Sequence, residues 1–277
     1  MDVSDANATT TTSDMSALAP AKLFDLRGRV ALVSGAAGGI GQELAAGMGL
    51  AGADIVLTDL PDSGLENVSS RLEANGIGCH TTADDLSDRS APQRIVDSAL
   101  GAFGRLDILI NCAVINQRVA LLDVDGGTYD RLMDIDLRAP FFLAQAAARV
   151  MVHNGGGAIV NLSSVNAQIG IETNGVYGPA KGALSQLTKV MAVEWSHLGI
   201  RANAIAPGFI ETPLTRALRD DQLRHEWILD RTPLGRLGQP EELVGMCLLL
   251  VSDAGAYITG QTLFVDGGML AGSRWDV

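Results

Sequence analysis

Short apolar runs alternate with longer segments of helical periodicity along most of the chain. Several of the apolar runs are hydrophobic at nearly every position, as is typical of parallel strands covered on both faces. Between them lie segments of about 10–20 residues, the lengths expected of crossover helices. The pattern predicts an α/β fold: one doubly wound parallel sheet of about seven strands with helices on both faces. The expected strands are residues 29–35, 53–59, 78–84, 106–112, 157–164, 200–207 and 261–268, and the clearest helices are residues 40–52, 89–104 and 174–199.

Two segments depart from this alternation. Residues 1–20 are polar and Thr-rich, and they hold neither the apolar run of a signal peptide nor the arginines of a transit peptide, so we expect a disordered N-terminal tail. Residues 208–238 carry charges, prolines and a tryptophan after the sixth expected strand. Ligands in open α/β sheets lie beyond the carboxyl ends of strands, so this segment is expected to form short helices and a substrate lid. No linker-like composition follows residue 26, and residues 21–277 are expected to form a single domain.

The composition narrows the range of functions. Hydrophobic residues make up 47% of the chain and charged residues 19%, which suits a large buried core. The formal net charge of −12 argues against a nucleic-acid or anionic-membrane partner. No apolar run reaches the length of a membrane span. Cys79, Cys112 and Cys247 are far apart in the sequence, so we expect no metal site, no disulfide framework and a cytoplasmic location.

A glycine-rich loop follows the first expected strand. The segment "SGAAGGIGQ" spans residues 34–42 and runs into an expected helix. Such a loop lets the backbone approach a pyrophosphate, and the helix N-terminus supplies N–H groups and a positive dipole end. The second expected strand ends at Asp59, near the spacing at which an acid binds the ribose hydroxyls of NAD and repels a 2′-phosphate. These features predict a Rossmann-type domain with NAD as the cofactor, although Asp59 could also be a helix cap or a solvated turn residue.

The order of further motifs resembles that of the short-chain dehydrogenase/reductase family. Gly35-x-x-x-Gly39-x-Gly41 is similar to the family's Thr-Gly-x-x-x-Gly-x-Gly loop, with Ser34 in the Thr place. The segments "DDLSD" (84–88), "VNLSS" (160–164), "YGPAK" (177–181), "NAIAPGFIETPL" (203–214) and "ITGQTLFVDGGM" (258–269) follow in the family's order, so the resemblance covers roughly residues 26–270. It implies a cofactor site formed by Gly35, Gly39, Ile40, Gly41, Asp59, Asp85, Leu86, Asn111, Tyr177, Lys181, Pro207, Gly208, Ile210 and Thr212.

The resemblance also implies a catalytic set of Ser164, Tyr177, Lys181 and Asp136. Oxidation of an alcohol needs a base for its proton, and a free tyrosine with a pKa of about 10 is a poor base at neutral pH. A lysine ammonium and the positive nicotinamide favour the phenolate and lower that pKa. Residues i and i+4 share a helix face, and Pro179 is tolerated if the helix begins near Tyr177. Ser164 is expected to hydrogen-bond the substrate oxygen, and by family analogy Lys181 also binds the nicotinamide ribose.

Two segments depart from the family pattern. Asp136 occupies the place of an Asn that helps hold a water in a proton relay to the lysine. An aspartate brings a charge and no N–H donor, so it could pair with Lys181 and shift the pH profile, or the relay could run differently. Asp136 could equally be a helix-surface acid. Cys112 and Val114 replace an Asn and a Gly after Asn111, and a valine lacks the backbone freedom of glycine.

The expected substrate follows from the branch of the family that the chain most resembles. "INQR" (115–118), "RTPLGRLGQPEEL" (231–243) and the closing "VDGGMLA" are similar to gluconate 5-dehydrogenase and 2-deoxygluconate 3-dehydrogenase. Arg118 is the candidate for binding a sugar-acid carboxylate, although a solvated loop arginine fits as well. Asn166 and Asn174 could bind sugar hydroxyls.

The resulting prediction is an NAD-dependent oxidoreductase that interconverts a secondary alcohol and a ketone on a sugar or sugar acid. The family implies a homotetramer in which Leu263 and Phe264 on the last strand lie between subunits. A 3-oxoacyl-type or other carbonyl reductase is the alternative within the family, but Asp59 and the net charge argue against NADP and a basic docking surface. A non-catalytic NAD-binding regulator and a structural subunit also remain open, and Asp136 and Val114 are the residues that favour the regulator.

Overall fold

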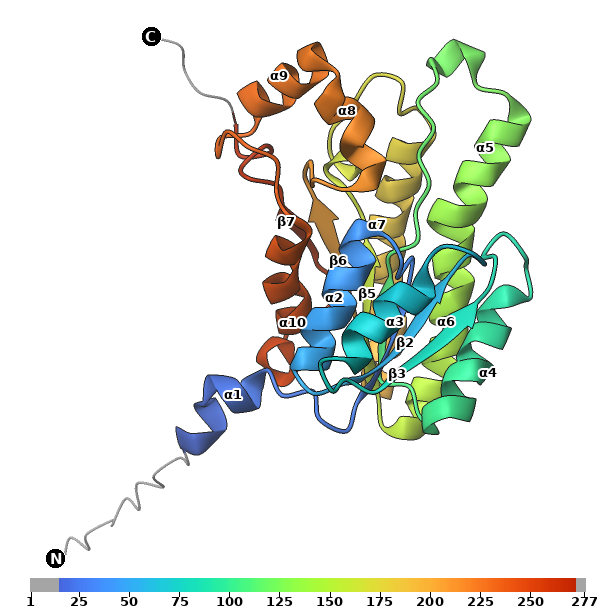
Figure 1. The fold of residues 1–277 in the computed structure, drawn as a ribbon, viewed down its shortest axis with the longest axis vertical. Coiled ribbons are helices and arrows are strands. Elements are labelled where there is room, and N and C mark those ends of the chain that lie inside the picture. Colours follow the sequence, from blue (N-terminus) through green and yellow to red (C-terminus); the bar gives the residue numbers. More distant parts are fainter. Residues whose placement is uncertain (1–14, 273–277) are drawn as a thin grey trace, which may run out of the picture.

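Seven parallel strands form one sheet in a computed structural model of the chain, which describes residues 15–272 (Figure 1). Their spatial order is β3-β2-β1-β4-β5-β6-β7. The strands are β1 (Val30–Ser34), β2 (Asp54–Asp59), β3 (Cys79–Ala83), β4 (Ile108–Asn111), β5 (Gly157–Leu162), β6 (Ile200–Pro207) and β7 (Thr262–Val265). Each of the seven lies inside a run that the sequence predicts as a strand. The doubly wound parallel sheet is therefore confirmed.

Helices cover both faces of the sheet because successive side chains of a strand point to opposite faces. Ala31 and Val33 of β1 pack in one apolar cluster with helices α2, α3 and α10, whereas Val30 and Leu32 pack in a second cluster with α4, α6 and α7. The helices of the first face are α2 (Gly39–Leu50), α3 (Leu65–Glu73) and α10 (Val244–Val251), and those of the second are α4 (Ala91–Phe103), α6 (Ala139–Met151) and α7 (Tyr177–Trp195). These two clusters form the core.

The chain order of the strands reverses between β1 and β4, which are neighbours in the sheet. Crossovers leave this point in opposite directions, so the loops after β1 and β4 separate and leave a crevice at the carboxyl edge. Both elements that the sequence assigns to chemistry reach this edge: the glycine loop after β1 and the Ser164 segment after β5. The fold thus places the predicted motifs at the same edge of the sheet.

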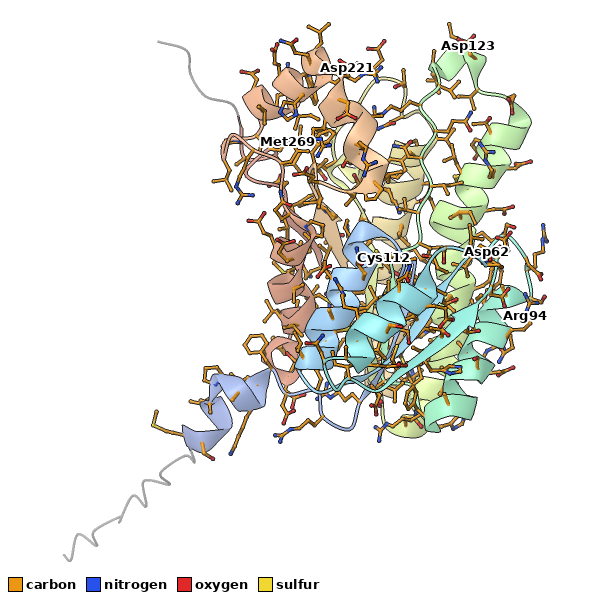
Figure 2. The ribbon with its side chains drawn as sticks, in the orientation of Figure 1. Asp62, Arg94, Cys112, Asp123, Asp221 and Met269 are labelled. Carbon is orange, nitrogen blue, oxygen red and sulfur yellow. The ribbon has the colours of Figure 1, made fainter. Side chains whose placement is uncertain are left out.

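The segment predicted as a lid contains short helices. They are η7 (Pro213–Thr215), α8 (Arg216–Asp220) and α9 (Gln222–Arg231), and Leu218, Ile228 and Leu237 form a small apolar cluster beneath them. The Asp221 carboxylate caps α9 by accepting the amide hydrogen of Arg224 at 3.1 Å (Figure 2). The helices are as expected, and their function as a lid remains a prediction.

Further helical segments lie at the N-terminus and before α6. Residues 1–14 of the predicted tail lie outside the described residues, and the following residues form η1 (Met15–Leu18) and α1 (Pro20–Leu23). The helix α5 (Gly126–Met133) leads into a π-helical turn, η3 (Asp134–Arg138), which continues directly into α6. Between residues 15 and 272, none of the helices is long and apolar enough to cross a membrane.

Candidate active site

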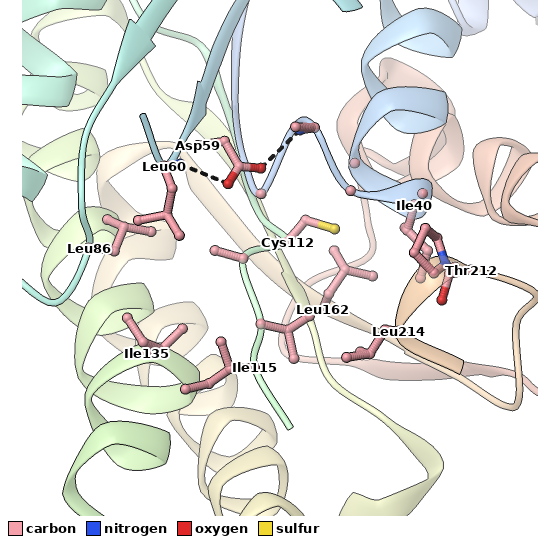
Figure 3. A pocket seen from close by; sticks show the side chains of 18 of the residues that line it. Ile40, Asp59, Leu60, Leu86, Cys112, Ile115, Ile135, Leu162, Thr212 and Leu214 are labelled. Carbon is pink, nitrogen blue, oxygen red and sulfur yellow. Dashed lines mark hydrogen bonds between the residues drawn. The ribbon is translucent and has the colours of Figure 1, made fainter. Parts of the chain in front are cut away.

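A cleft of about 590 Å³ opens at the carboxyl edge of the sheet, where the loops after β1, β4 and β5 meet (Figure 3). It brings together most of the residues that the sequence predicts for the site. The predicted residues that line it are Gly35, Gly39, Ile40, Gly41, Asp59, Asp85, Leu86, Ser164, Tyr177, Lys181, Pro207, Gly208, Ile210 and Thr212. Five predicted residues do not line it: Asn111, Arg118, Asp136, Asn166 and Asn174.

The glycine loop leaves no room for side chains at two positions. Gly35 has φ +67°, and a Cβ there would lie 2.6 Å from the backbone nitrogen of Ala113. A Cβ at Gly41 would lie 2.2 Å from the carbonyl oxygen of Gly35. Helix α2 begins at Gly39, so its free N–H groups face the cleft beside this bare backbone. This cradle fits a pyrophosphate.

Asp59 stands at one end of the cleft with its carboxylate held by backbone amides. It accepts hydrogen bonds from the amides of Ala37 at 2.9 Å and Leu60 at 2.8 Å (Figure 3). The cationic side chains that line the cleft in the described part of the chain are Arg131 and Lys181, and these are engaged with Gln117 and Asp136. No cation therefore balances the Asp59 carboxylate inside the cleft among residues 15–272.

Tyr177 and Lys181 occupy the other end of the cleft. Helix α7 begins at Tyr177, so Pro179 falls in the first turn, where the proline costs no intrahelical hydrogen bond. One turn later, Lys181 Nζ lies 5.5 Å from the centre of the Tyr177 ring. It donates a hydrogen bond to the carbonyl oxygen of Leu162 at 3.1 Å and lies 3.3 Å from Asp136 Oδ1. The helix start and the shared face agree with the sequence prediction.

The electrostatics of this pair differ from the simple expectation. Burial raises the pKa of Tyr177; Lys181 and Ser164 act in the opposite direction, while Asp136 adds to the effect of burial. Burial by itself lowers the pKa of Lys181, but attraction to Asp136 and Tyr177 outweighs it, so the pKa of Lys181 is raised. Lys181 thus lowers the pKa of Tyr177 as expected, yet in this protein the tyrosine pKa remains above its usual value.

Asp136 lies behind the cleft on the π-helical turn η3, and its side chain is fully buried. Burial raises the pKa of this carboxyl group, and the neighbouring Lys181 ammonium opposes that rise. π-turns inside helices often occur at functional sites. The helix-surface alternative for Asp136 does not hold, because the side chain is in contact with Lys181.

Ser164 lies at the end of β5 and is 6% exposed. Its Oγ accepts hydrogen bonds from the backbone and the side-chain nitrogen of Asn166, both at 3.1 Å. Asn174 Nδ2 donates in turn to Asn166 Oδ1 at 3.0 Å. The two asparagines expected at the substrate hydroxyls therefore have their amides in a chain that ends on Ser164.

Asn111 and Arg118 also lie outside the cleft. Asn111 pairs with Asn161 in the register of β4 and β5, and its amide donates to Asn161 Oδ1 at 2.8 Å, so the side chain braces the sheet. Arg118 is partly buried, and within residues 15–272 it forms no ion pair. Burial lowers the pKa of Arg118, the charge of Arg224 on the lid lowers it further, and Tyr177 opposes both.

The loop after β4 accommodates its departures from the family pattern. Val114 does not adopt a positive φ, since among the described non-glycine residues only Asp62 and Thr173 do. Burial raises the pKa of the Cys112 thiol to about 12, so it behaves as a small apolar side chain. Ser34 Oγ accepts the amide hydrogens of Cys112 and Ala113 at 3.2 and 3.3 Å, which ties this loop to the glycine loop.

Several residues of the cleft could not be predicted from the sequence, because their residue types indicate no particular chemistry. Ile115, Ile135, Leu162 and Leu214 form an apolar wall (Figure 3). Ser63 follows Asp59 by four residues, and only that proximity could have pointed to it. Within residues 15–272 no group of three His, Cys, Asp or Glu side chains is gathered as ligands of a metal ion would be.

Comparison with known proteins agrees with this geometry. The family described as enoyl-(acyl carrier protein) reductase matches residues 35–270. A short-chain type dehydrogenase/reductase from Mycobacterium marinum superposes with a TM-score of 0.86 at 35% identity, covering 90% of this chain and 98% of that one. This chain belongs to the short-chain dehydrogenase/reductase family. It is therefore an oxidoreductase of a family whose members bind a nicotinamide cofactor.

Two relatives within the short-chain dehydrogenase/reductase family are named as dehydrogenases of a sugar acid. Gluconate 5-dehydrogenase of Gluconobacter oxydans (strain 621H) is 40% identical over 247 residues, covering 89% of this chain and 96% of the relative. A gluconate 5-dehydrogenase from Burkholderia cenocepacia J2315, crystallised with NADP and tartrate, is 38% identical with a TM-score of 0.88 and covers 91% of this chain and 99% of that one. The family assignment made from the motifs is confirmed.

Proposed function

We propose that the protein is an NAD(H)-dependent dehydrogenase that interconverts a secondary alcohol and a ketone on a gluconate-like sugar acid. The observation that carries this proposal is the meeting of Ser164, Tyr177 and Lys181 at one end of a cleft whose other end is the glycine cradle. The names of the two gluconate dehydrogenases reported above support the substrate class.

The proposed roles follow from the chemistry of each group. Tyr177, as the phenolate, accepts the proton of the substrate hydroxyl, and Lys181 favours that phenolate by its positive charge. Ser164 stabilises the charge that develops on the substrate oxygen. When bound, NAD would supply the acceptor for the hydride that leaves the carbinol carbon. The glycine cradle, with Asp85, Leu86, Pro207, Gly208, Ile210 and Thr212, holds the dinucleotide.

NAD, rather than NADP, is proposed on the basis of Asp59. The carboxylate is fixed by the amides of Ala37 and Leu60 and has no balancing cation inside the cleft among the described residues. A 2′-phosphate beside it would bring two like charges together, which disfavours NADP. The B. cenocepacia relative was crystallised with NADP, so the preference of this chain has to be measured directly.

Arg118 is the proposed partner of the substrate carboxylate. Three observations support this role: Arg118 is partly buried, it lacks an ion pair among residues 15–272, and its charge lowers the pKa of Tyr177. Partial burial of a guanidinium without an acidic partner is costly, and a ligand carboxylate would supply that partner. Its neighbour Val119 forms a β-bridge with Asn174, whose amide donates to Asn166.

The experiment compares two substrates in one variant. Arg118→Leu is expected to raise KM for an aldonate by roughly 10–100-fold and to leave the KM of a neutral polyol of equal length nearly unchanged, because one charge-assisted hydrogen-bonded pair is lost. Equal effects on both substrates would mean that Arg118 is a solvated loop residue and that the carboxylate is bound elsewhere.

We further propose a cytoplasmic homotetramer, with residues 1–20 as a tail, residues 21–277 as one domain and residues 208–238 as the substrate lid. The three cysteines are free, which fits a reducing compartment. Helices α6 and α7 share a hollow of about 350 Å³ bordered by exposed Phe141 and Val190, and Phe264 on β7 is 36% exposed. Such apolar surface favours association with further copies. Mass measurement in solution distinguishes a dimer from a tetramer.

A further inference from the structure

The hydroxyl of Ser164 has its acceptor capacity filled by one residue. A serine oxygen offers two lone pairs and a single hydrogen. The backbone nitrogen and Nδ2 of Asn166 both donate to Ser164 Oγ at 3.1 Å. With both lone pairs engaged, the hydroxyl hydrogen is the part of Ser164 that remains available for donation into the cleft.

The direction of these hydrogen bonds depends on Asn174. An asparagine amide can turn over, exchanging its oxygen and nitrogen. Asn174 Nδ2 donates to Asn166 Oδ1 at 3.0 Å and so holds the Asn166 oxygen away from Ser164. If Asn166 were reversed, its oxygen would face Ser164 and take the hydroxyl hydrogen. Asn174, acting through Asn166, therefore determines whether the Ser164 hydroxyl donates its hydrogen to Asn166 or keeps it for the cleft.

The backbone of Asn174 is held in place by its neighbours. The residue is 4% exposed, and among residues 15–272 its Oδ1 has no hydrogen-bond partner. Its backbone carbonyl accepts the amide hydrogen of Gly178 in the first turn of α7, at 3.0 Å, and it forms an isolated β-bridge with Val119. The preceding Thr173 has φ +65°, a strained conformation for a β-branched residue. Strain of this kind is found mostly at functional sites, where surrounding contacts maintain it.

We propose that Asn174 is a positioning residue which, through Asn166, keeps the Ser164 hydroxyl as a hydrogen-bond donor to the reacting oxygen of the substrate. The inference rests on the proposed function. During ketone reduction the oxygen gains negative charge, and the donor stabilises it; during oxidation the same donor stabilises the alkoxide. Ser164 neither loses nor gains a proton, since the substrate proton passes to or from Tyr177 Oη. Asn166 and Asn174 then serve the substrate indirectly, through Ser164.

The test compares variants that change the direction of one hydrogen bond. Asn166→Asp is close in shape to the native residue, but its carboxylate can only accept, so it takes the Ser164 hydrogen. We expect the plateau value of kcat to fall by about 100-fold or more in Asn166→Asp, and only by roughly 10-fold in Asn166→Ala, where the hydrogen stays free. Asn174→Leu releases the amide of Asn166 and is expected to lie between these two. KM should change little in all three.

The added charge of Asn166→Asp has an effect of its own that the pH profile separates. Tyr177 is acted on by Lys181, Asp136 and Arg118, and a further negative charge raises the pKa of the tyrosine. A charge effect alone moves the profile to higher pH and leaves the plateau intact. Capture of the Ser164 hydrogen lowers the plateau itself. In a Ser164→Ala background, Asn166→Asp is expected to cause no further loss of plateau kcat.

Three results of these measurements would overturn the inference. A higher plateau kcat in Asn166→Asp than in Asn166→Ala overturns the inference, as does an equal loss with and without Ser164. So does an Asn174→Leu variant that turns over within twofold of wild type. NADH binding and the unfolding temperature, measured on each variant, confirm that the comparison concerns folded enzyme. If wild type oxidises no sugar acid, the proposed function itself fails, and the inference falls with it.

Discussion

Lys181 Nζ lies 3.3 Å from Asp136 Oδ1, and the two side chains are 2% and 0% exposed. An ion pair so completely removed from water is held together strongly, but each partner depends on the other to offset its desolvation. The pair stands directly behind Tyr177, so its balance of charge acts on the proposed base. The members of the family that the sequence resembles carry an uncharged Asn at the position of Asp136. In this protein Asp136 therefore partly neutralises the lysine that we propose to activate Tyr177.

Replacing Asp136 by Asn is expected to move the pH profile of alcohol oxidation to lower pH. The Asp136 charge raises the pKa of Tyr177, so its removal lowers that pKa and gives more phenolate near neutral pH. The pH of half-maximal kcat/KM should fall by about one pH unit, and activity at pH 7 should be preserved or increased. A profile in the wild-type position, or a large loss of activity at every pH, would show that the carboxylate has a different task.

Replacing Lys181 by Gln is expected to reduce stability in a pH-dependent manner. The variant leaves Asp136 buried without a counter-charge, so the folded-state pKa of Asp136 rises further above the usual value of an aspartate. Because the pKa of Asp136 is higher in the folded than in the unfolded state, the stability of the variant falls as the pH rises from the unfolded-state pKa through the folded-state pKa. The deficit relative to wild type should be small near pH 4 and reach about 3–5 kcal/mol at neutral pH.

Urea unfolding at several pH values measures this deficit. The matched control is Lys181→Gln combined with Asp136→Asn, which removes both charges and should regain most of the stability while remaining inactive. A deficit independent of pH, or one that the second substitution does not relieve, would contradict the ion-pair explanation.

The sequence predicted the fold well because the strands carry a strong hydrophobic pattern, and each of the seven lies where that pattern places it. It predicted the glycine loop and the Tyr–Lys turn because both are local. The Lys181–Asp136 pair joins residues 45 positions apart on different helices, and no spacing rule reveals such a contact. Resemblance to a family placed Asp136 near the lysine, but only the structure shows that the two are in contact.

The difference between local patterns and contacts distant in the sequence also explains why some residues lie elsewhere than expected. Asn111 sits beside Asn161 in the strand register, and that pairing turns its amide into the sheet rather than toward the cleft. Asn166 lies two residues after Ser164, a spacing at which a serine side chain commonly accepts a backbone amide. Its side chain is directed by Asn174, eight residues further on, across a loop with no regular periodicity.

Replacing Tyr177 by Phe is expected to lower kcat by about 10²–10⁴-fold, the usual contribution of a general acid–base group. The ring and its contact with Lys181 are retained, so NADH binding, measured by the fluorescence of the bound nicotinamide, should stay within a few-fold of wild type. Near-normal turnover with the true substrate would remove Tyr177 from the mechanism.

Two glycine-to-alanine substitutions distinguish the cofactor cradle from ordinary glycines. Gly35→Ala places a Cβ 2.6 Å from the Ala113 backbone at φ +67°, and we expect a loss of about 2 kcal/mol or more in stability together with loss of NADH binding. Gly101 lies inside α4, with nothing within 4 Å of a new Cβ. Gly101→Ala should therefore stabilise the protein by about 0.5–1 kcal/mol and leave binding unchanged. Similar NADH affinities in both variants would argue against the cradle.

Cofactor preference is expected to depend on Asp59. In wild type, kcat/KM should be higher with NAD than with NADP, because the fixed carboxylate binds ribose hydroxyls and repels a 2′-phosphate. Asp59→Ser should reduce that ratio by about 10-fold or more, mainly through the KM of each cofactor. Equal turnover of NAD and NADP by the wild-type protein would show that Asp59 does not select the cofactor.

We propose above that this cleft oxidises the alcohol group of a sugar acid with NAD. The most direct measurement is the reduction of NAD, followed at the absorbance of NADH, over a panel of aldonates with neutral sugars and polyols of matched length. We expect turnover with at least one aldonate at a kcat/KM well above that of every neutral compound. Turnover confined to the neutral compounds, or no reduction of NAD with any compound of the panel, would contradict it.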